Sequence, residues 1–317
     1  MSFSSTTKNE LARIPITDNC CKLAELAALV RMCGTIQISG NNNINIKFTT
    51  ENAAIARRLF TFLKELYEGD IEVMVRRNRQ LKKNNNYHIA IKDKDISRKL
   101  LIDVGFLSED EDINIFNILY KINNDLLIKR CCRRSYIRGA FLGAGSISNP
   151  EKTYHIEFVT NNKEQSEELS NIINSFRLNS KIVLRKDNYV VYLKEGEQIV
   201  DLLNIMGAHQ ALLKFEDIRV LKDVRNNINR LVNCETANLT KTIDASLRQL
   251  EDIEKIQSSM GLEKLPKKLR DVAEIRLENP DATLKEIGLM LEPPVGKSGV
   301  NHRFRKIGEI AEDLKGV

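Results

Sequence analysis

The sequence of 317 residues has no tryptophan, only six prolines and fifteen glycines, and only four histidines. So little proline and glycine excludes a collagen-like or linker-dominated chain, and the four scattered histidines argue against a histidine-rich metal site. The longest apolar run is the five residues 26–30, whereas a membrane-spanning helix needs about 20. The first residues also lack the apolar segment of a secretory signal. We therefore expect a cytoplasmic protein without membrane association.

Six cysteines are present, but their spacing fits neither of the usual uses of cysteine. Adjacent cysteines form poor disulfides, and the chain has neither the CxxC nor the HExxH spacing of a zinc site. We therefore interpret them as reduced thiols packed in the core, and we predict no metal site and no cofactor. The cysteines are Cys20, Cys21, Cys33, Cys131, Cys132 and Cys234.

The excess of basic over acidic residues is small. Lysine and arginine number 49 against 43 aspartates and glutamates, so the formal net charge is +6. This balance favours an anionic partner, although the distribution of charge along the chain is a better guide to a binding surface than the total charge. The length is enough for about two domains of ~100–200 residues each.

The most informative feature is an internal repeat. Residues 20–34 read CCKLAELAALVRMCG and residues 131–145 read CCRRSYIRGAFLGAG, so the cysteine pair and the final glycine superpose at an offset of 111. Three further blocks match in the same order. They pair residues 44–52 with 154–162, 87–93 with 189–195, and 100–105 with 202–207. A duplicated unit with loop deletions explains this order.

Within each repeat, helical spacing alternates with the period-2 pattern of half-buried strands. The order predicted for each unit is αββαββα, which places the chain in the α+β class. An all-α helix-turn-helix domain is expected after the duplicated domain. We predict a first repeat with an N-terminal helix over 1–106, a linker over 107–130, a second repeat over 131–208, connecting helices over 209–261 and a helix-turn-helix domain over 262–317.

A duplicated αββαββα unit opened by a helix that ends in glycine resembles the LAGLIDADG homing endonucleases. The resemblance implies that the two opening helices pack against each other and that two sheets form a saddle over DNA. The family's metal-binding acids align with Cys33 and Ala144, and the other acidic position of the motif is filled by Arg31 and Leu142. Two-metal phosphodiester cleavage needs acidic ligands for Mg²⁺. We therefore predict no catalytic residues and no nuclease activity.

Two segments are rich in positive charge and could contact DNA phosphates. One is a hairpin tip whose cations are Arg76, Arg77, Arg79, Lys82 and Lys83. The other is residues 129–138, which carry five cations. For both, the alternative is an ordinary solvated surface. A third polar segment, residues 229–238, is dense in amides. We expect it to cap helices; the alternatives are that it joins the two halves of the chain or touches the DNA backbone.

The C-terminal segment reads as three helices, with the third beginning near Ser298. Its apolar residues Val300, Phe304, Ile307, Ala311 and Leu314 form one stripe. The opposite face is basic, as in a recognition helix that enters the major groove; the alternative is a solvated basic helix. The DNA-binding residues predicted are Thr283, Lys285, Lys297, Ser298, Asn301, His302, Arg303, Arg305 and Lys306.

Together with the degenerate repeats, the segments NRLVNCETANLTKT (229–242), LPKKLRDVAEIRLENPDATLKEIGLML (265–291) and KSGVNHRFRKI (297–307) closely resemble the WhiA family. The resemblance implies a DNA-binding transcription regulator of cell division, chromosome segregation or sporulation, located at the nucleoid. It implies double-stranded DNA as the partner and a LAGLIDADG-like part that serves as a protein platform, which could bind a sigma factor or another regulator. Alternatives are a residual metal-dependent nuclease and a protein-interaction scaffold. Because the first half already contains two copies of the unit, we expect a monomer.

Overall fold

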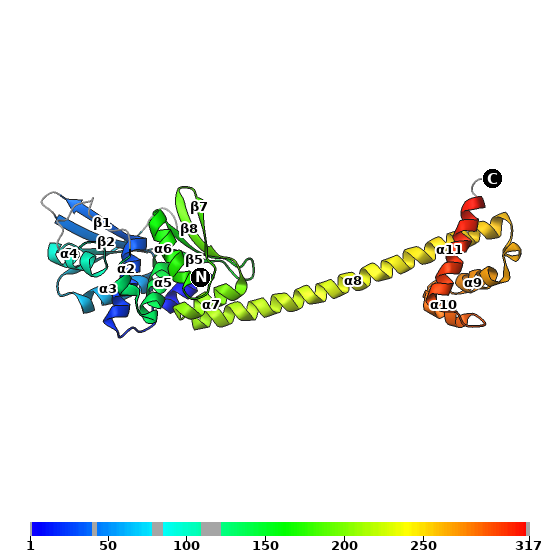
Figure 1. Cartoon of the computed structure of the whole chain (residues 1–317), viewed down its shortest axis with the longest axis horizontal. Helices are drawn as coiled ribbons and strands as arrows, with labels where there is room; N and C mark the ends of the chain where they lie inside the picture. Colours follow the sequence, from blue (N-terminus) through cyan, green and yellow to red (C-terminus); the bar gives the residue numbers. More distant parts are fainter. Residues whose placement is uncertain (1, 40–42, 78–84, 109–121, 315–317) are drawn as a thin grey trace. The chain divides into compact units, whose positions relative to one another are not determined.

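The structure is a computed structural model that describes residues 2–39, 43–77, 85–108 and 122–314. The chain divides into two compact units, residues 1–222 and 223–317. Helix α8 (His209–Ser259) begins in the first unit and ends in the second (Figure 1). None of the helices in the described ranges is long and apolar enough to cross a membrane.

The first unit begins with helix α1 (Phe3–Leu11) and then contains the predicted repeat twice. The elements of the first repeat are α2 (Asn19–Cys33), β1 (Gly34–Ser39), β2 (Asn43–Thr50), α3 (Ala53–Leu66), β3 (Ile71–Arg77), β4 (Asn85–Ile91) and α4 (Lys94–Asp103). Those of the second are α5 (Arg130–Ala144), β5 (Gly145–Ile147), β6 (Ile156–Thr160), α6 (Lys163–Asn174), β7 (Lys181–Arg185), β8 (Asn188–Leu193) and α7 (Gly196–Met206). The predicted α+β class and αββαββα order are confirmed.

Each repeat forms one four-stranded antiparallel sheet, and the two sheets share a topology. The strand orders are β1-β2-β4-β3 and β5-β6-β8-β7. The alternating residues Ile44, Ile46 and Phe48 of β2 are fully buried, as the period-2 pattern predicts. Equivalent asparagines begin the next helix of each repeat. The Asn52 side chain accepts from the Ala54 and Ile55 amides, and the Asn162 side chain accepts from the Gln165 amide.

Helices α2 and α5 pack closely together in the centre of this unit (Figure 1). A Cβ atom placed on Gly139 would lie 2.4 Å from the carbonyl oxygen of Glu25 and 3.0 Å from the Cβ of Ala28. A Cβ on Gly143 would lie 2.8 Å from the Cβ of Met32. Only glycine permits so close an approach of the two backbones.

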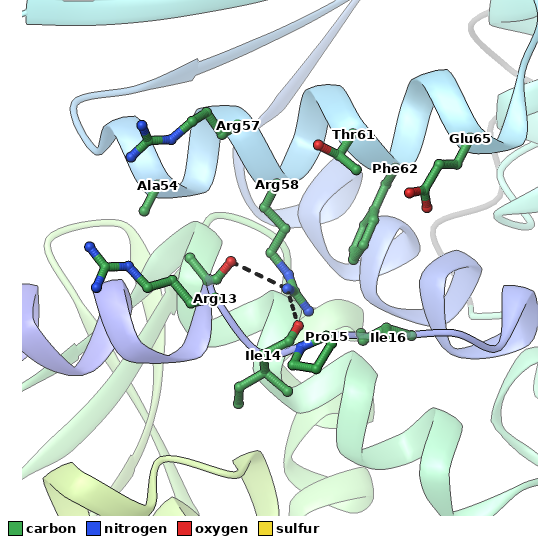
Figure 2. Close-up of a pocket in the computed structure, with 11 residues that line it drawn as sticks. Arg13, Ile14, Pro15, Ile16, Ala54, Arg57, Arg58, Thr61, Phe62 and Glu65 are labelled. Carbon is green, nitrogen blue, oxygen red and sulfur yellow. Dashed lines mark hydrogen bonds between the residues drawn. The ribbon is translucent and has the colours of Figure 1, made fainter.

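A buried carboxylate lies in the same seam. Glu25 of α2 is fully buried and forms ion pairs with Arg58 of α3 and Arg138 of α5. Arg58 also donates to the carbonyl oxygens of Ala12 (3.3 Å) and Ile14 (2.6 Å). Figure 2 shows Arg58 and Ile14 among the residues that line a surface pocket. These contacts attach α3, α5 and the segment after α1 to α2.

The second unit contains the end of α8, then α9 (Lys267–Glu278), α10 (Leu284–Met290) and α11 (Lys297–Asp313). Ile253 and Ile256 of α8 are fully buried in one core with Val272, Ile287 and Val300. Thus the last turns of α8 belong to the core of the helix-turn-helix unit.

One expectation from the sequence is wrong. The amide-rich residues 229–238 cap no helix, because they lie in the interior of α8 and are exposed there. One of their polar side chains bonds one turn back along the same helix, because the Asn238 amide group donates to Cys234 Sγ at 3.8 Å. Just beyond the segment, Thr240 and Thr242 donate in the same way to the carbonyl oxygens of Thr236 and Asn238.

The contact at Gly139 predicts the reverse of the usual effect of alanine in a helix. Glycine to alanine ordinarily stabilises a helix interior by about 0.5–1 kcal/mol. Here we expect Gly139→Ala to destabilise the first unit by about 1–3 kcal/mol, because the new methyl overpacks the α2–α5 seam. Calorimetry of the full chain measures this. The control is Gly308→Ala in α11, where the Cβ would meet, among the described residues, only the flexible Asp252 carboxylate at 3.3 Å. Equal or greater stability of Gly139→Ala would contradict the packing described.

Candidate nucleic-acid interface

Helix α11 is amphipathic, and its apolar stripe places its polar face outward. Val300, Phe304, Ile307 and Ala311 are buried against α9 and α10. Residues on the opposite side of the helical wheel therefore face solvent. The exposed members of the predicted set on this helix are Lys297, Ser298, Asn301, His302, Arg305 and Lys306.

The exposed residues divide between the outer face and one flank. Ser298, His302 and Lys306 follow one another at intervals of four residues, so they lie along one line of the helix. Asn301 and Arg305 instead line a pocket between α11 and α8. Arg305 also forms an exposed ion pair with Glu309, at 3.5 Å.

Arg303 differs from its neighbours, because its side chain turns toward α9. It is half-buried and donates to the carbonyl oxygen of Lys268 at 3.4 Å. This position suits a residue that holds α11 on α9 better than one that reaches a base.

The two predicted residues near α10 have different surroundings. The Thr283 hydroxyl accepts from the Glu286 amide while the Glu286 carboxylate accepts from the Thr283 amide, a reciprocal capping box. These hydrogen bonds lower the pKa of Glu286. Thr283 therefore has a structural role at the start of α10, and Lys285 is exposed on the same helix.

The position of α11 depends on a residue that the sequence did not single out. Arg276 of α9 is buried, and its guanidinium donates to Gln249 Oε1 of α8 (3.2 Å) and to the carbonyl oxygen of Ala282 (2.6 Å). It also lies 5.3 Å from the centre of the Phe304 ring. One cation thus contacts α8, α11 and the loop before α10. The available signal was an arginine at helical spacing in the apolar stripe of α9.

Only part of the hairpin proposed as a secondary DNA contact is described. Arg76 and Arg77 are exposed at the end of β3, whereas Arg79, Lys82 and Lys83 lie outside the described residues. The pKa of His88 on β4 is lowered by partial burial and by the nearby charges of Lys47 and Arg76. Two cations, Lys47 and Arg76, thus lie near His88 on this part of the sheet.

In the second basic segment, residues 129–138, several arginines bond to neighbouring backbone. Arg134 donates to the carbonyl oxygen of Ile205 at 2.7 Å, and Arg138 donates to that of Met206 at 2.8 Å. Both acceptors belong to the last turn of α7, where positive charge complements the helix dipole. Arg133 donates to the carbonyl oxygen of Leu127. These three arginines hold neighbouring backbone and are poorly placed for phosphates.

The positions of the absent catalytic acids lie at the ends of the two central helices. Cys33 ends α2 and Ala144 ends α5. The Cys33 thiol donates to the carbonyl oxygen of Leu29, and burial raises its pKa to about 12. Lys8 is close enough to oppose this shift, and its ammonium donates to the carbonyl oxygen of Leu142. A neutral thiol, a methyl group and an ammonium do not fit Mg²⁺, which prefers oxygen ligands.

The two units of the chain define a class of protein in which a duplicated LAGLIDADG-like domain is joined to a helix-turn-helix unit. Family models agree with this division. The WhiA N-terminal LAGLIDADG-like domain matches residues 19–107, the WhiA LAGLIDADG-like domain matches 133–225, and the WhiA C-terminal HTH domain matches 228–311. The chain belongs to the WhiA family.

Individual relatives extend over the whole chain. A probable cell division protein WhiA of Alkaliphilus metalliredigens (strain QYMF) is 59% identical, covering 100% of this chain and 99% of the relative. One of Alkaliphilus oremlandii (strain OhILAs) is 60% identical, covering 99% and 98%. The crystal structure of full-length DUF199/WhiA from Thermatoga maritima matches with a TM-score of 0.59 at 27% identity, over 99% of both chains.

The raised pKa of Cys33 predicts slow alkylation. Because the thiolate is the reactive form, we expect Cys33 to react with iodoacetamide at least about tenfold more slowly than an ordinary thiol at about pH 8. Mass spectrometry of the native protein measures the rate, with exposed Cys234 as the internal reference. Similar rates for the two thiols would contradict the raised pKa of Cys33.

Proposed function

We propose that this protein is a non-enzymatic, DNA-binding transcription regulator of cell division that reads duplex DNA with α11. The observation that carries the proposal is the basic segment from Lys297 to Lys306, which contains four cations and no acid. The apolar stripe of α11 directs most of this segment to solvent. The names of the relatives and of the matching C-terminal domain support the same role.

The start and the middle of α11 suit different contacts. Lys297 and Ser298 are in the first turn of α11, and helix N-termini attract phosphates through their amides and dipole. Asn301 and Arg305 carry the side chains that pair with adenine and guanine edges in the major groove. Thus the start of the helix would hold the backbone while its middle reads bases.

Single substitutions on α11 test the proposal. We expect Arg305→Ala to weaken duplex binding by about 1–3 kcal/mol if its side chain reads a base, and Lys306→Ala to reduce the slope of log K against log salt by about 1 if it contacts a phosphate. Fluorescence anisotropy on labelled duplex across a salt series measures both. Unchanged affinity in both variants would remove α11 as the reading helix.

The control is Lys241→Ala, which removes the same charge from the exposed surface of α8. An equal loss there would mean that total charge, rather than α11, determines binding. Arg76→Ala/Arg77→Ala tests the sheet in the same assay, and a larger loss than on α11 would assign DNA binding to the first unit. Full-length variants are preferable to a cut at residue 261, because Ile253 and Ile256 complete the helix-turn-helix core.

Because Cys33 and Ala144 occupy the positions of the catalytic acids, we also expect that the protein does not cut DNA. Supercoiled plasmid incubated with the protein and Mg²⁺ or Mn²⁺ should remain supercoiled, because no carboxylate pair occupies the ends of α2 and α5 to hold the metal. Nicking that follows the protein through purification and is lost with chelator would instead support a nuclease with an unusual metal site.

A further inference from the structure

Four cysteines of the first unit converge at one end of the α2–α5 seam. Cys20 and Cys21 lie in the first turn of α2, and Cys131 and Cys132 lie in the first turn of α5. Their four Sγ atoms all lie within 4.8 Å of one another. The equivalence of the two pairs under the internal repeat explains this convergence, because both helices begin at the same point of the pseudo-twofold seam.

The contacts within the group cross from one helix to the other. Cys21 of α2 lies beside Cys131 of α5, and Cys20 of α2 lies beside Cys132 of α5. Cys21 and Cys132 are 5% and 3% exposed, Cys20 is half-buried, and Cys131 is exposed. Ala24 packs against the buried thiols. The group is therefore partly enclosed but accessible on one side.

The separation of the sulfurs suits one metal ion. With Zn–S bonds of about 2.3 Å, a tetrahedral site has sulfurs about 3.8 Å apart, so the observed group needs to contract only slightly. All four cysteines are free thiols in the structure. An iron–sulfur cluster distributes its cysteines over several irons and separates them more widely.

We propose that Cys20, Cys21, Cys131 and Cys132 bind one zinc ion as a tetrathiolate site that joins the two repeats. Each helix supplies two sulfurs, so neither repeat can form the site alone. On binding, the four thiols lose their protons to solvent and the four Sγ atoms coordinate Zn²⁺. The site has a net charge of −2 and leaves no ligand position open, as in structural zinc sites.

The surroundings favour this negative charge. Both first turns contribute the positive end of a helix dipole, and neither Asp18 nor Lys129, the residues that precede the two helices, caps its helix with a side chain. The Ser135 hydroxyl lies near Cys21 in the same small pocket, where it could orient the ligand. Arg134 lines a pocket of about 220 Å³ beside Cys21 and Cys131. Asp18 lines the same pocket and is the opposing charge.

The same pocket provides an access route for the ion, which a genuine metal site needs. Cys131, the most exposed of the four sulfurs, would be the first to meet an incoming ion. The buried Cys21 and Cys132 would then complete coordination from within the seam.

The test is metal titration of the full-length protein, reduced and stripped with chelator. We expect one Co²⁺ per chain, with the ligand-field and sulfur-to-cobalt charge-transfer bands of a tetrahedral thiolate site, and displacement of Co²⁺ by one Zn²⁺. The variant Cys20→Ser/Cys131→Ser removes the two less buried ligands. It should bind Zn²⁺ more than about 100-fold more weakly, beyond the ~10–100-fold cost of losing an outer-shell partner.

The matched control is Cys33→Ser/Cys234→Ser, which removes the other two cysteines and should retain full affinity. Mass spectrometry of alkylated wild-type protein gives a result independent of any variant, because Zn²⁺ should protect the four ligands but not Cys234. A wild-type protein that binds neither ion with a thiolate spectrum, equal binding by the two double variants, or iron with acid-labile sulfide in the purified protein would each overturn the proposal.

Discussion

The close approach of α2 and α5 is the constraint on which the first unit depends. Gly139 lets the two backbones meet at Glu25, and the Glu25 carboxylate is then buried between Arg58 and Arg138. Such a buried group adds little net stability while it is paired, but loss of one partner typically costs about 3–5 kcal/mol, because a charge is left uncompensated. A shift of α2 along α5 that separated Glu25 from Arg138 would therefore be penalised. The register of α2 on α5 places the four cysteines together at one end of the seam and Cys33 and Ala144 at the other.

The basic segments show why composition alone does not identify a nucleic-acid surface. Residues 129–138 and 297–306 have similar densities of positive charge. In the first segment, Arg133, Arg134 and Arg138 donate to nearby carbonyl oxygens. In the second, Lys297 and Lys306 stand on exposed positions of α11. The difference arises from tertiary partners, chiefly the end of α7, which pattern alone does not reveal.

Most of the fold could be predicted from the sequence, because the repeat is local and appears twice. The matching blocks and strand alternation predicted the αββαββα order, and the apolar stripe of α11 predicted its exposed face. The convergence of the cysteines could not be predicted from ligand spacing, since each segment supplies only two adjacent cysteines and the set forms across a tertiary axis. The contacts of Arg276 were missed for a similar reason: they join α9 to α8, α11 and the loop before α10, and most of its acceptors are backbone carbonyls, which have no sequence signature. The positions of Arg79, Lys82 and Lys83 lie outside the described residues.

Because the two repeats are fused into one chain, the seam between them need not obey a rule that applies to symmetric dimers. Across a true twofold axis each residue meets a copy of itself or of its partner, so a seam between identical helices must be self-complementary. Here Ala28 is equivalent to Gly139, and Met32 is equivalent to Gly143. In each pair the larger residue meets its equivalent glycine across the seam. Glu25 likewise has Tyr136 as its counterpart, so a single carboxylate is buried and two like charges do not face each other. A single gene can thus specialise one half of the seam without changing the other.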